Sequence, residues 1–420
     1  MDRRLFLQAT TLTSGLILPF GRTAWAALDG IPAGAGKLIV IMLRGAVDGL
    51  NVVVPYGDAN YARLRPGIGL GLPGADAGVI DLDGFFGLHP ALADLQPLWS
   101  AKKLAFVHAS GSPDPTRSHF DAQDYLESGT PGRKSTPDGW LNRLAAMLPG
   151  MAGPTRAISI GPAAPRILSG RVASTNLAAG PAGTRRDLLD RPEVGDAFAA
   201  LYKNSTRLAQ AYEDARASHR EIMAASREES MIADGGAPLP NGFPADAARL
   251  AGLMRRDPNI NLAFMALGGW DTHAGQGAAK GQLANRLAPL GRGLSILARQ
   301  LGPVFDQTTI LVMSEFGRTA RENGNGGTDH GHGNVMWLLG GRVAGGRVHG
   351  DWPGLEASAL HEGRDLAVTT DFRNVLMQVC QQLSLKDATL DGLFPGLPAR
   401  QSSTAPLFAT LAAPRRQHLG

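Results

Sequence analysis

The chain has 420 residues, and 41 lysines and arginines against 37 aspartates and glutamates give it a formal net charge of +4. The basic residues are scattered and form no long run, so the charge pattern gives no support to nucleic-acid binding. The sequence has one cysteine, Cys380, so an internal disulfide is excluded. Iron–sulfur cysteines, a c-type haem motif and a dinucleotide fingerprint are absent from the sequence, which disfavours an oxidoreductase.

The N-terminus has three features of an export signal in the expected order. Residues 3–6 (RRLF) match the twin-arginine (Tat) address, residues 9–20 are weakly apolar, and residues 24–26 (AWA) form a small-x-small cleavage pattern. They predict a Tat signal peptide over residues 1–26, a transient partnership with the Tat translocase, and a periplasmic or extracellular location. No later segment reaches transmembrane length.

Buried strands and helices alternate along the rest of the chain. Continuous apolar runs are typical of strands covered on both faces, and they occur at 37–43, 104–108, 156–160, 261–267, 308–313 and 335–339. Helical patterns lie between and after them, at 91–100, 119–127, 139–148, 281–301 and 372–383. This alternation predicts an α/β fold with a doubly wound, mainly parallel sheet.

The domain organisation follows from composition. Residues 27–400 are predicted to form one large α/β domain. Residues 193–231 are rich in Ala, Glu, Arg, Lys and Gln, so a helical insertion is predicted over 191–237, either as a lid or dimer arm or as an extra surface helix. Residues 401–420 are predicted to form a loosely ordered tail.

Acidic and histidine side chains follow two of the predicted strands. Asp48 lies shortly after strand 37–43, where a ligand carboxylate and a simple turn aspartate are equally compatible with the pattern. Asp271 and His273 follow strand 261–267 and are two residues apart, so in extended backbone their side chains share a face. Ligands collect at the carboxyl ends of strands in open α/β sheets, and a carboxylate with an imidazole suits Zn²⁺ or Mn²⁺.

The densest group of such side chains is Asp329, His330 and His332. Flanking glycines permit backbone angles that let neighbouring side chains point to one centre. This group predicts metal ligands, and the alternative is a polar turn with exposed histidines.

Ser118 and His119 open a predicted helix. Ser118 fits an N-cap, with Asp121 completing a start similar to a capping box. A hydroxyl at a helix N-terminus also lies in a positive dipole that favours an alkoxide and binds anions, so a chemical role is compatible with the structural one.

Six segments in one order carry a family resemblance: the Tat signal, RGAVDGLN, RSHFDAQDYLESG, GGWDTH, SEFGRT and GTDHGHGNVMWLLGGRVAGG. Together they resemble a widespread family of Tat-exported bacterial proteins of unknown function, which is similar to the alkaline phosphatase/sulfatase superfamily. The resemblance covers nearly the whole mature chain. It implies an alkaline phosphatase-like sheet with one or two divalent metal ions (Zn, Mn, Mg or Ca) and an anionic ester as the substrate.

Site residues are implied by the same resemblance. The metal ligands implied are Asp48, Asp271, His273, Asp329 and His330, with His332 as the last histidine and His349 and His361 as its rivals. The implied nucleophile is Ser118, with Thr116 behind it, and the residues implied to contact the anion are Arg44, Arg117 and His119.

The sequence also departs from the superfamily pattern. Asp271 and His273 are closer together than in typical phosphatases of this class, and no sulfatase-type cysteine motif is present, which disfavours a formylglycine sulfatase. We therefore expect an exported, metal-dependent hydrolase of phosphate or sulfate esters. The alternative is a non-catalytic exported binding or assembly protein that keeps the fold.

Overall fold

The computed structural model describes residues 36–150, 153–179 and 233–383, together with 385, 390, 392–397 and 406–409. The predicted signal peptide, most of the predicted insertion at 191–237 and most of the predicted tail lie outside these residues, so those three features stay predictions. No helix in the described part of the chain is long and apolar enough to cross a membrane.

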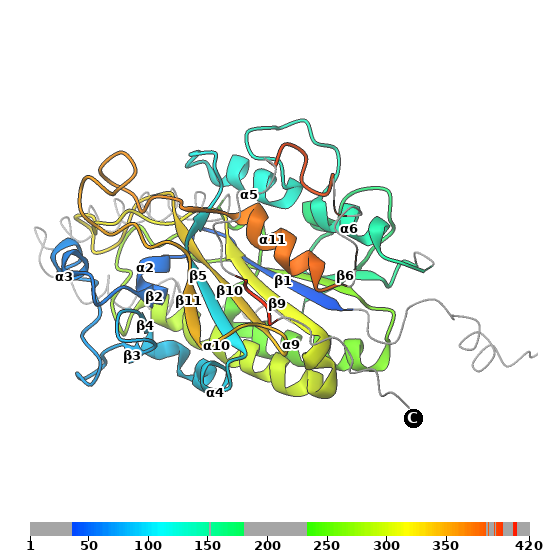
Figure 1. The fold of residues 1–420 in the computed structure, drawn as a ribbon, viewed down its shortest axis with the longest axis horizontal. Coiled ribbons are helices and arrows are strands. Elements are labelled where there is room, and N and C mark those ends of the chain that lie inside the picture. The colour runs from blue at the N-terminus through cyan, green and yellow to red at the C-terminus, as the bar shows by residue number, and fades with distance from the viewer. Residues whose placement is uncertain are drawn as a thin grey trace, which may run out of the picture.

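A nine-stranded sheet forms the centre of the described fold, in the order β11-β5-β10-β9-β1-β8-β6-β7, with β12 paired to β5 (Figure 1). Its strands are β1 (Lys37–Leu43), β5 (Leu104–Gly111), β6 (Ala157–Ile160), β7 (Thr175–Leu177), β8 (Leu262–Leu267), β9 (Thr308–Ser314), β10 (Asn334–Gly340), β11 (Arg347–His349) and β12 (Thr370–Asp371). All pairings are parallel except those of β10, which runs antiparallel to both β5 and β9. The predicted mainly parallel sheet is confirmed.

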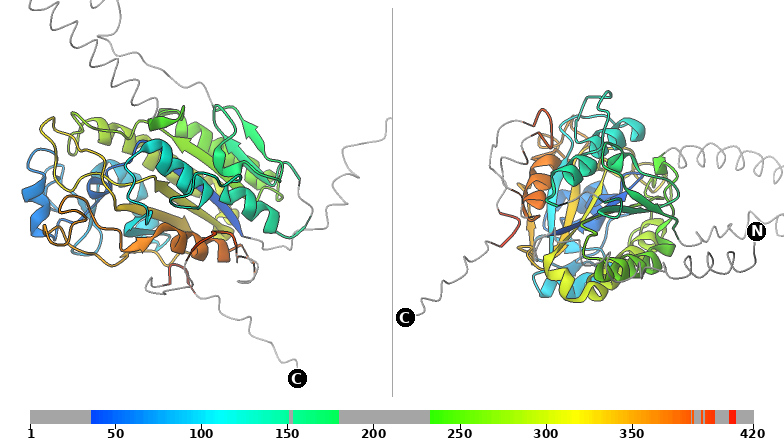
Figure 2. Two further views of the ribbon diagram at one scale, coloured as in Figure 1. Left: turned by 90° about the horizontal axis from the view of Figure 1, so that it is seen from above. Right: turned by 90° about the vertical axis from the view of Figure 1, so that its right-hand side faces the viewer.

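Helices cover both faces of this sheet (Figure 2). Those on one face pack with Ile39 and Ile41 of β1 and include η1 (Pro90–Leu95), α4 (Gln96–Ser100), α9 (Phe243–Arg256) and α10 (Gln282–Leu301). Those on the other face pack with Leu38 and Val40 and include α5 (His119–Ser128), α6 (Trp140–Met147) and α11 (Phe372–Gln381). Because successive β1 side chains point to opposite faces, an unbroken apolar run satisfies both cores.

Smaller elements complete the described part. A second sheet has the order β2-β4-β3, formed by β2 (Val53–Val54), β3 (Ile80–Asp81) and β4 (Gly87–Leu88). The remaining short helices are α2 (Gly49–Val52), α3 (Ala59–Leu64), η2 (Arg166–Leu168), η4 (Pro240–Gly242) and η5 (Gly302–Gln307).

Strand direction decides where polar side chains gather. Since β1, β5, β8 and β9 are parallel, their carboxyl ends meet at one edge of the sheet. The antiparallel β10 begins at that same edge. Loops after β5, β8 and β9 and the loop before β10 therefore converge there.

Candidate metal centre

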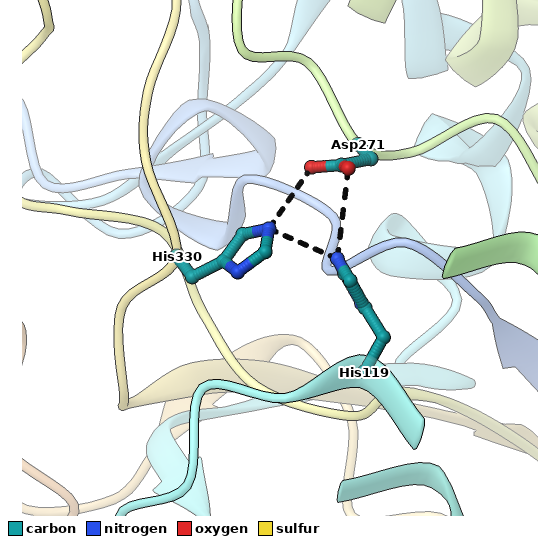
Figure 3. Close-up of side chains that lie close together, drawn as sticks. All are labelled: His119, Asp271 and His330. Carbon is teal, nitrogen blue, oxygen red and sulfur yellow. Dashed lines mark hydrogen bonds and ion pairs between the residues drawn. The ribbon is translucent and has the colours of Figure 1, made fainter. Parts of the chain in front are cut away.

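Three side chains from distant parts of the chain meet at this edge (Figure 3). They are His119 at the start of α5, Asp271 after β8 and His330 just before β10. Each offers one ligand atom, and these atoms all lie within 4.8 Å of one another.

The atoms that meet are two imidazole nitrogens and a carboxylate. His119 Nε2 lies 3.0 Å from His330 Nε2. Asp271 Oδ1 lies 3.3 Å from His330 Nε2, and Asp271 Oδ2 lies 3.6 Å from His119 Nε2. His273 approaches the same atoms, with its Nε2 3.0 Å from Asp271 Oδ1 and 3.0 Å from His330 Nε2. Three imidazoles and one carboxylate thus point toward a common region.

Each imidazole has an acceptor behind it, at Nδ1. His119 Nδ1 lies 2.8 Å from Glu315 Oε1, His330 Nδ1 lies 2.9 Å from the Arg117 carbonyl, and His273 Nδ1 lies 3.3 Å from Asp329 Oδ1. A carbonyl or carboxylate oxygen only accepts, so each Nδ1 donates its proton there and each Nε2 faces the cluster. In a neutral ring that Nε2 offers a lone pair to a metal ion, and in an imidazolium it donates to Asp271. Two lone pairs 3.0 Å apart need a cation between or on them. This donor arrangement fits a divalent metal, because metal-bound histidines characteristically give their other N–H to such an acceptor.

The pKa of His119 agrees with a site that holds positive charge. Burial disfavours the imidazolium, but the carboxylates of Asp271 and Glu315 outweigh it and raise the pKa of His119 to about 9. A proton on Nε2 would then occupy the position that a metal ion would take. The cluster thus favours a positive charge at this position, either a proton or a metal ion.

Glu315 is the buried anchor of His119. It is 1% exposed, and besides His119 its Oε1 accepts from the Gly45 amide at 2.7 Å and from Gln123 Nε2 at 3.0 Å. Burial alone would raise its pKa, yet the hydrogen bond and charge of His119, with backbone amides, hold the pKa of Glu315 below its usual range. An ionised glutamate is therefore kept in the interior behind one ring.

Arg318 holds the carboxylate of the cluster. Its Nη1 lies 2.6 Å from Asp271 Oδ1, while its Nε donates to Thr328 Oγ1 at 3.1 Å. Burial opposes ionisation of Asp271, but hydrogen bonds from the three histidines and the charge of Arg318 hold its pKa far below the usual range. The Asp271 carboxylate therefore stays ionised and is held in place by Arg318.

The other residues predicted as metal ligands lie outside the three-residue cluster. Asp48 is fully buried, paired with Arg65 at 2.5 Å and bonded to Gln276 at 2.6 Å. Gln276 accepts from Thr328 Oγ1 at 3.1 Å, which in turn contacts Arg318, so Asp48 is connected to Asp271 through a chain of hydrogen bonds. Asp329 contacts Nδ1 of His273.

His332, which was predicted as the last histidine ligand, and its rivals also lie apart from the cluster. His332 stacks on His361 with ring centroids 4.6 Å apart, and burial lowers its pKa to about 4. His349 contacts the Ala344 carbonyl through Nε2 at 3.1 Å. The structure thus brings together Asp271, His273 and His330 from the predicted set, with His119 added to them.

The residues predicted to act on the substrate occupy several places. Ser118 is exposed and is the N-cap of α5, where its Oγ accepts from the Asp121 amide at 3.4 Å. The Arg117 guanidinium pairs with Glu362 and Asp365, while its carbonyl holds His330. Arg44 pairs with Glu127 and lies outside the cluster.

Two supporting residues, Glu315 and Arg318, were not predicted. Both follow the buried strand β9 directly, in the segment Ser314-Glu315-Phe316-Gly317-Arg318. Their position at a strand end was the available signal, the same one that identified Asp271 and His273.

Comparison with solved structures gives distant likenesses. They include a protein in the alkaline phosphatase superfamily from Vibrio parahaemolyticus, with a TM-score of 0.38, 10% identity, and coverage of 73% of this chain and 60% of that chain. Another is the lipoteichoic acid synthase LtaP from Listeria monocytogenes, with a TM-score of 0.38, 9% identity, and coverage of 80% and 75%. Murine ectonucleotide pyrophosphatase/phosphodiesterase 5 gives a TM-score of 0.39, 8% identity, and coverage of 84% and 96%.

No match was found among curated proteins. A family model does match, and it spans residues 35–387, which is most of the chain and includes His119, Asp271, His273 and His330. The chain therefore belongs to the family described as "Protein of unknown function (DUF1501)".

Proposed function

We propose that this chain is an exported, metal-dependent hydrolase of phosphate or sulfate esters. The observation that carries the proposal is the convergence of the Nε2 atoms of His119, His273 and His330 on Asp271, with each Nδ1 held by an acceptor. Fixed ring orientation and fixed protonation are what a catalytic metal site requires of its ligands. The resemblance to phosphatases and sulfatases in the sequence supports the choice of ester.

The donor set narrows the choice of metal. Imidazole nitrogen suits Zn²⁺ and Mn²⁺, whereas Ca²⁺ and Mg²⁺ prefer sites built from oxygen. We therefore expect Zn²⁺ or Mn²⁺ in preference to the other two. Bound here, such an ion supplies Lewis acidity toward a phosphoryl or sulfuryl oxygen.

The protein's own residues hold and orient that site. Glu315 keeps the proton of His119 on Nδ1, and the Arg117 carbonyl does the same for His330. Arg318 fixes Asp271 through Oδ1. Ser118 precedes the ligand His119 and lies exposed at the N-terminus of α5, which supports its role as the proposed nucleophile.

Metal analysis tests the site. Purified protein should contain a transition metal by elemental mass spectrometry, and Asp271→Asn or His330→Ala should lose it while the fold, measured by circular dichroism, persists. His332→Ala is the matched control, because His332 lies two residues from His330 yet outside the cluster. A folded wild-type chain that takes up neither Zn²⁺ nor Mn²⁺ would contradict the proposal and favour the non-catalytic alternative.

Two substitutions of Ser118 separate its two roles. Ser118→Ala removes both the hydroxyl and the helix cap, at a cost of about 1 kcal/mol in stability. Ser118→Asn keeps a capping oxygen but has no hydroxyl. Loss of phosphate- or sulfate-ester hydrolysis in both variants supports a nucleophile, whereas activity retained in Ser118→Asn would show that Ser118 acts only as a cap.

Export is tested at the N-terminus. Replacing Arg3 and Arg4 with lysine removes the twin-arginine pair while keeping the charge. We expect the doubly substituted precursor to stay in the cytoplasmic fraction, measured by immunoblot of cell fractions. Normal export of that variant would exclude the Tat route.

A further inference from the structure

Two separate loops supply three of the four side chains that converge at this edge of the sheet. The β8 loop, residues 268–281, holds Asp271 and His273, and the β10 loop, residues 315–333, holds His330. His273 Nε2 and His330 Nε2 are 3.0 Å apart, so a small shift of one loop against the other would separate the ligand atoms. The geometry of the cluster therefore depends on the contacts between the two loops.

The side chain of Gln276, in the β8 loop, joins the two loops. Its Oε1 accepts from the hydroxyl of Thr272 at 2.7 Å and from the hydroxyl of Thr328, in the β10 loop, at 3.1 Å. The Thr328 amide also donates to the Thr272 carbonyl at 3.1 Å. None of the three residues is more than 1% exposed, so water has little access to replace a lost partner, and a buried polar atom left unpaired is costly.

Asp48 fixes the direction in which the amide of Gln276 points. The carboxylate of Asp48 pairs with Arg65 and accepts from Gln276 Nε2 at 2.6 Å, and the side chains of Asp48 and Arg65 are fully buried. Because a carboxylate only accepts, the NH₂ group of Gln276 must face Asp48 and its carbonyl oxygen must face the two threonines. Asp48 therefore supports the contact between the two loops.

Thr328 extends this contact to the carboxylate of the cluster. Its hydroxyl oxygen accepts from Arg318 Nε at 3.1 Å, which leaves the hydroxyl proton for Gln276 Oε1. Nη1 of Arg318 in turn donates to Asp271 Oδ1 at 2.6 Å. Thr272, which follows Asp271 in the chain, donates to the same oxygen of Gln276. One amide oxygen therefore restrains Asp271 by two routes, one through the adjoining backbone and one through Arg318.

We propose that Gln276 is a positioning residue, which sets the β8 loop against the β10 loop and thereby places Asp271, His273 and His330. Its effect on metal binding rests on the proposed function, whereas the placement of the histidines can be measured without a metal ion. Because backbone hydrogen bonds also join the loops, we expect the loops to stay together when the side chain of Gln276 is changed. The side chain then acts on the geometry of the cluster and not only on the stability of the fold.

Gln276→Met tests the proposal, because methionine has a similar shape and makes none of the three side-chain hydrogen bonds of Gln276. The full chain, labelled with ¹⁵N-histidine, is compared with and without added Zn²⁺. Asn142→Leu is the matched control, because Asn142 is 3% exposed and its side chain also makes three hydrogen bonds, between α6 and residues 168–172. Both variants should lower the midpoint of urea denaturation, but only Gln276→Met should move the ring resonances of His273 and His330.

Thr328→Val is a milder variant of the same contact. It removes only the hydroxyl that joins the β10 loop to Gln276 and to Arg318. It should move the same two ring resonances, which keeps the proposal testable if Gln276→Met does not fold.

Co²⁺ gives a second measurement, because its visible absorption spectrum reports the geometry of its ligands. Gln276→Met should change that spectrum and bind Co²⁺ about tenfold more weakly, at the lower end of the range for residues behind metal ligands, whereas Asn142→Leu should match the wild type. Ring resonances of His273 and His330 that stay unchanged in Gln276→Met and Thr328→Val, or that move equally in Asn142→Leu, would overturn the proposal. A wild-type chain that takes up neither Zn²⁺ nor Co²⁺ would contradict the metal-dependent hydrolase, and the ring resonances would still decide the role of Gln276.

Discussion

Glu315 is a single side chain that contacts a proposed metal ligand and can set its affinity for the ion. It is buried and ionised, and it accepts the Nδ1 proton of His119. Glu315→Gln keeps the shape but removes the charge, so Nε2 of His119 becomes a poorer donor to a metal. We expect the affinity for Zn²⁺, measured by competition with a chelating dye, to fall by about 10- to 100-fold.

The comparison residue for that experiment is Asp329. It accepts from His273 Nδ1 at 3.3 Å but is 55% exposed, so water can replace its oxygen. Asp329→Asn should weaken Zn²⁺ binding by less than about tenfold, at the lower end of the range for residues of this kind. A larger effect in Asp329→Asn than in Glu315→Gln would show that Asp329 is itself a ligand, as the sequence resemblance implies.

At this level the sequence predicted part of the site. Asp271 and His273 could be found because they directly follow a buried run, and His330 because glycines flank a dense polar group. His330 and His332 were both predicted as ligands. That only His330 of the two lies in the cluster could not be predicted, since it depends on His330 pairing across a bridge with Arg318. His119 was predicted to contact the anion and was not predicted as a metal ligand. Its distance from Asp271 depends on how α5 packs, which the sequence does not reveal.

Among the elements, the turn after β1 leaves no room for a side chain at Gly45. Gly45 has φ +111°, and a Cβ there would lie 2.7 Å from the backbone nitrogen of Asp271. Gly45→Ala should therefore displace a predicted metal ligand and cost about 3 kcal/mol or more in unfolding free energy, measured by urea denaturation. Gly74→Ala is the matched control, because Gly74 has φ +85° with nothing within 4 Å, so only backbone strain of about 1 kcal/mol remains. Equal losses in the two variants would show that the close approach to Asp271 has no consequence.

Strands and helices could be predicted where a single local sequence pattern was long enough to identify them. The six predicted strands are confirmed as β1, β5, β6, β8, β9 and β10. They could be predicted because long apolar runs are typical of a sheet that is covered on both faces. The two- and three-residue strands, such as β11 and β12, have no pattern long enough to recognise. α9 was not predicted, although Phe243, Ala247, Leu250 and Met254 recur at helical spacing. The antiparallel direction of β10 could not be read, since a buried run looks the same in either direction.

For the whole molecule, His108 joins the two sheets and makes stability depend on pH. It lies on β5, donates through Nε2 to the Val53 carbonyl of β2 at 2.9 Å and stacks on Phe86. Burial lowers the pKa of His108 from 6.5 to about 4, so between these values the unfolded chain binds more protons than the folded one. The free energy of unfolding should therefore decrease as pH falls from 6.5 to 4, by up to about 1.4 kcal/mol per pH unit for this group.

His108→Gln tests that assignment. Glutamine can keep a donor toward the Val53 carbonyl and does not titrate. Urea denaturation at several pH values should show a shallower loss of stability between pH 6.5 and 4 in the variant than in the wild type. Identical slopes would mean that other groups, such as His89, whose pKa burial lowers to about 4, account for the whole dependence.

The position of β10 within the sheet also affects the order in which the fold can form during synthesis. β10 lies between β5 and β9, yet both neighbours leave the ribosome before it, so each has an unpaired edge until residue 340 emerges. His330 stands four residues ahead of β10, so the cluster closes only as that central strand inserts. Uptake of an ion would then be among the last events of folding. In a protein proposed to be exported already folded, a bound metal would distinguish a finished chain from one still too incomplete to be exported.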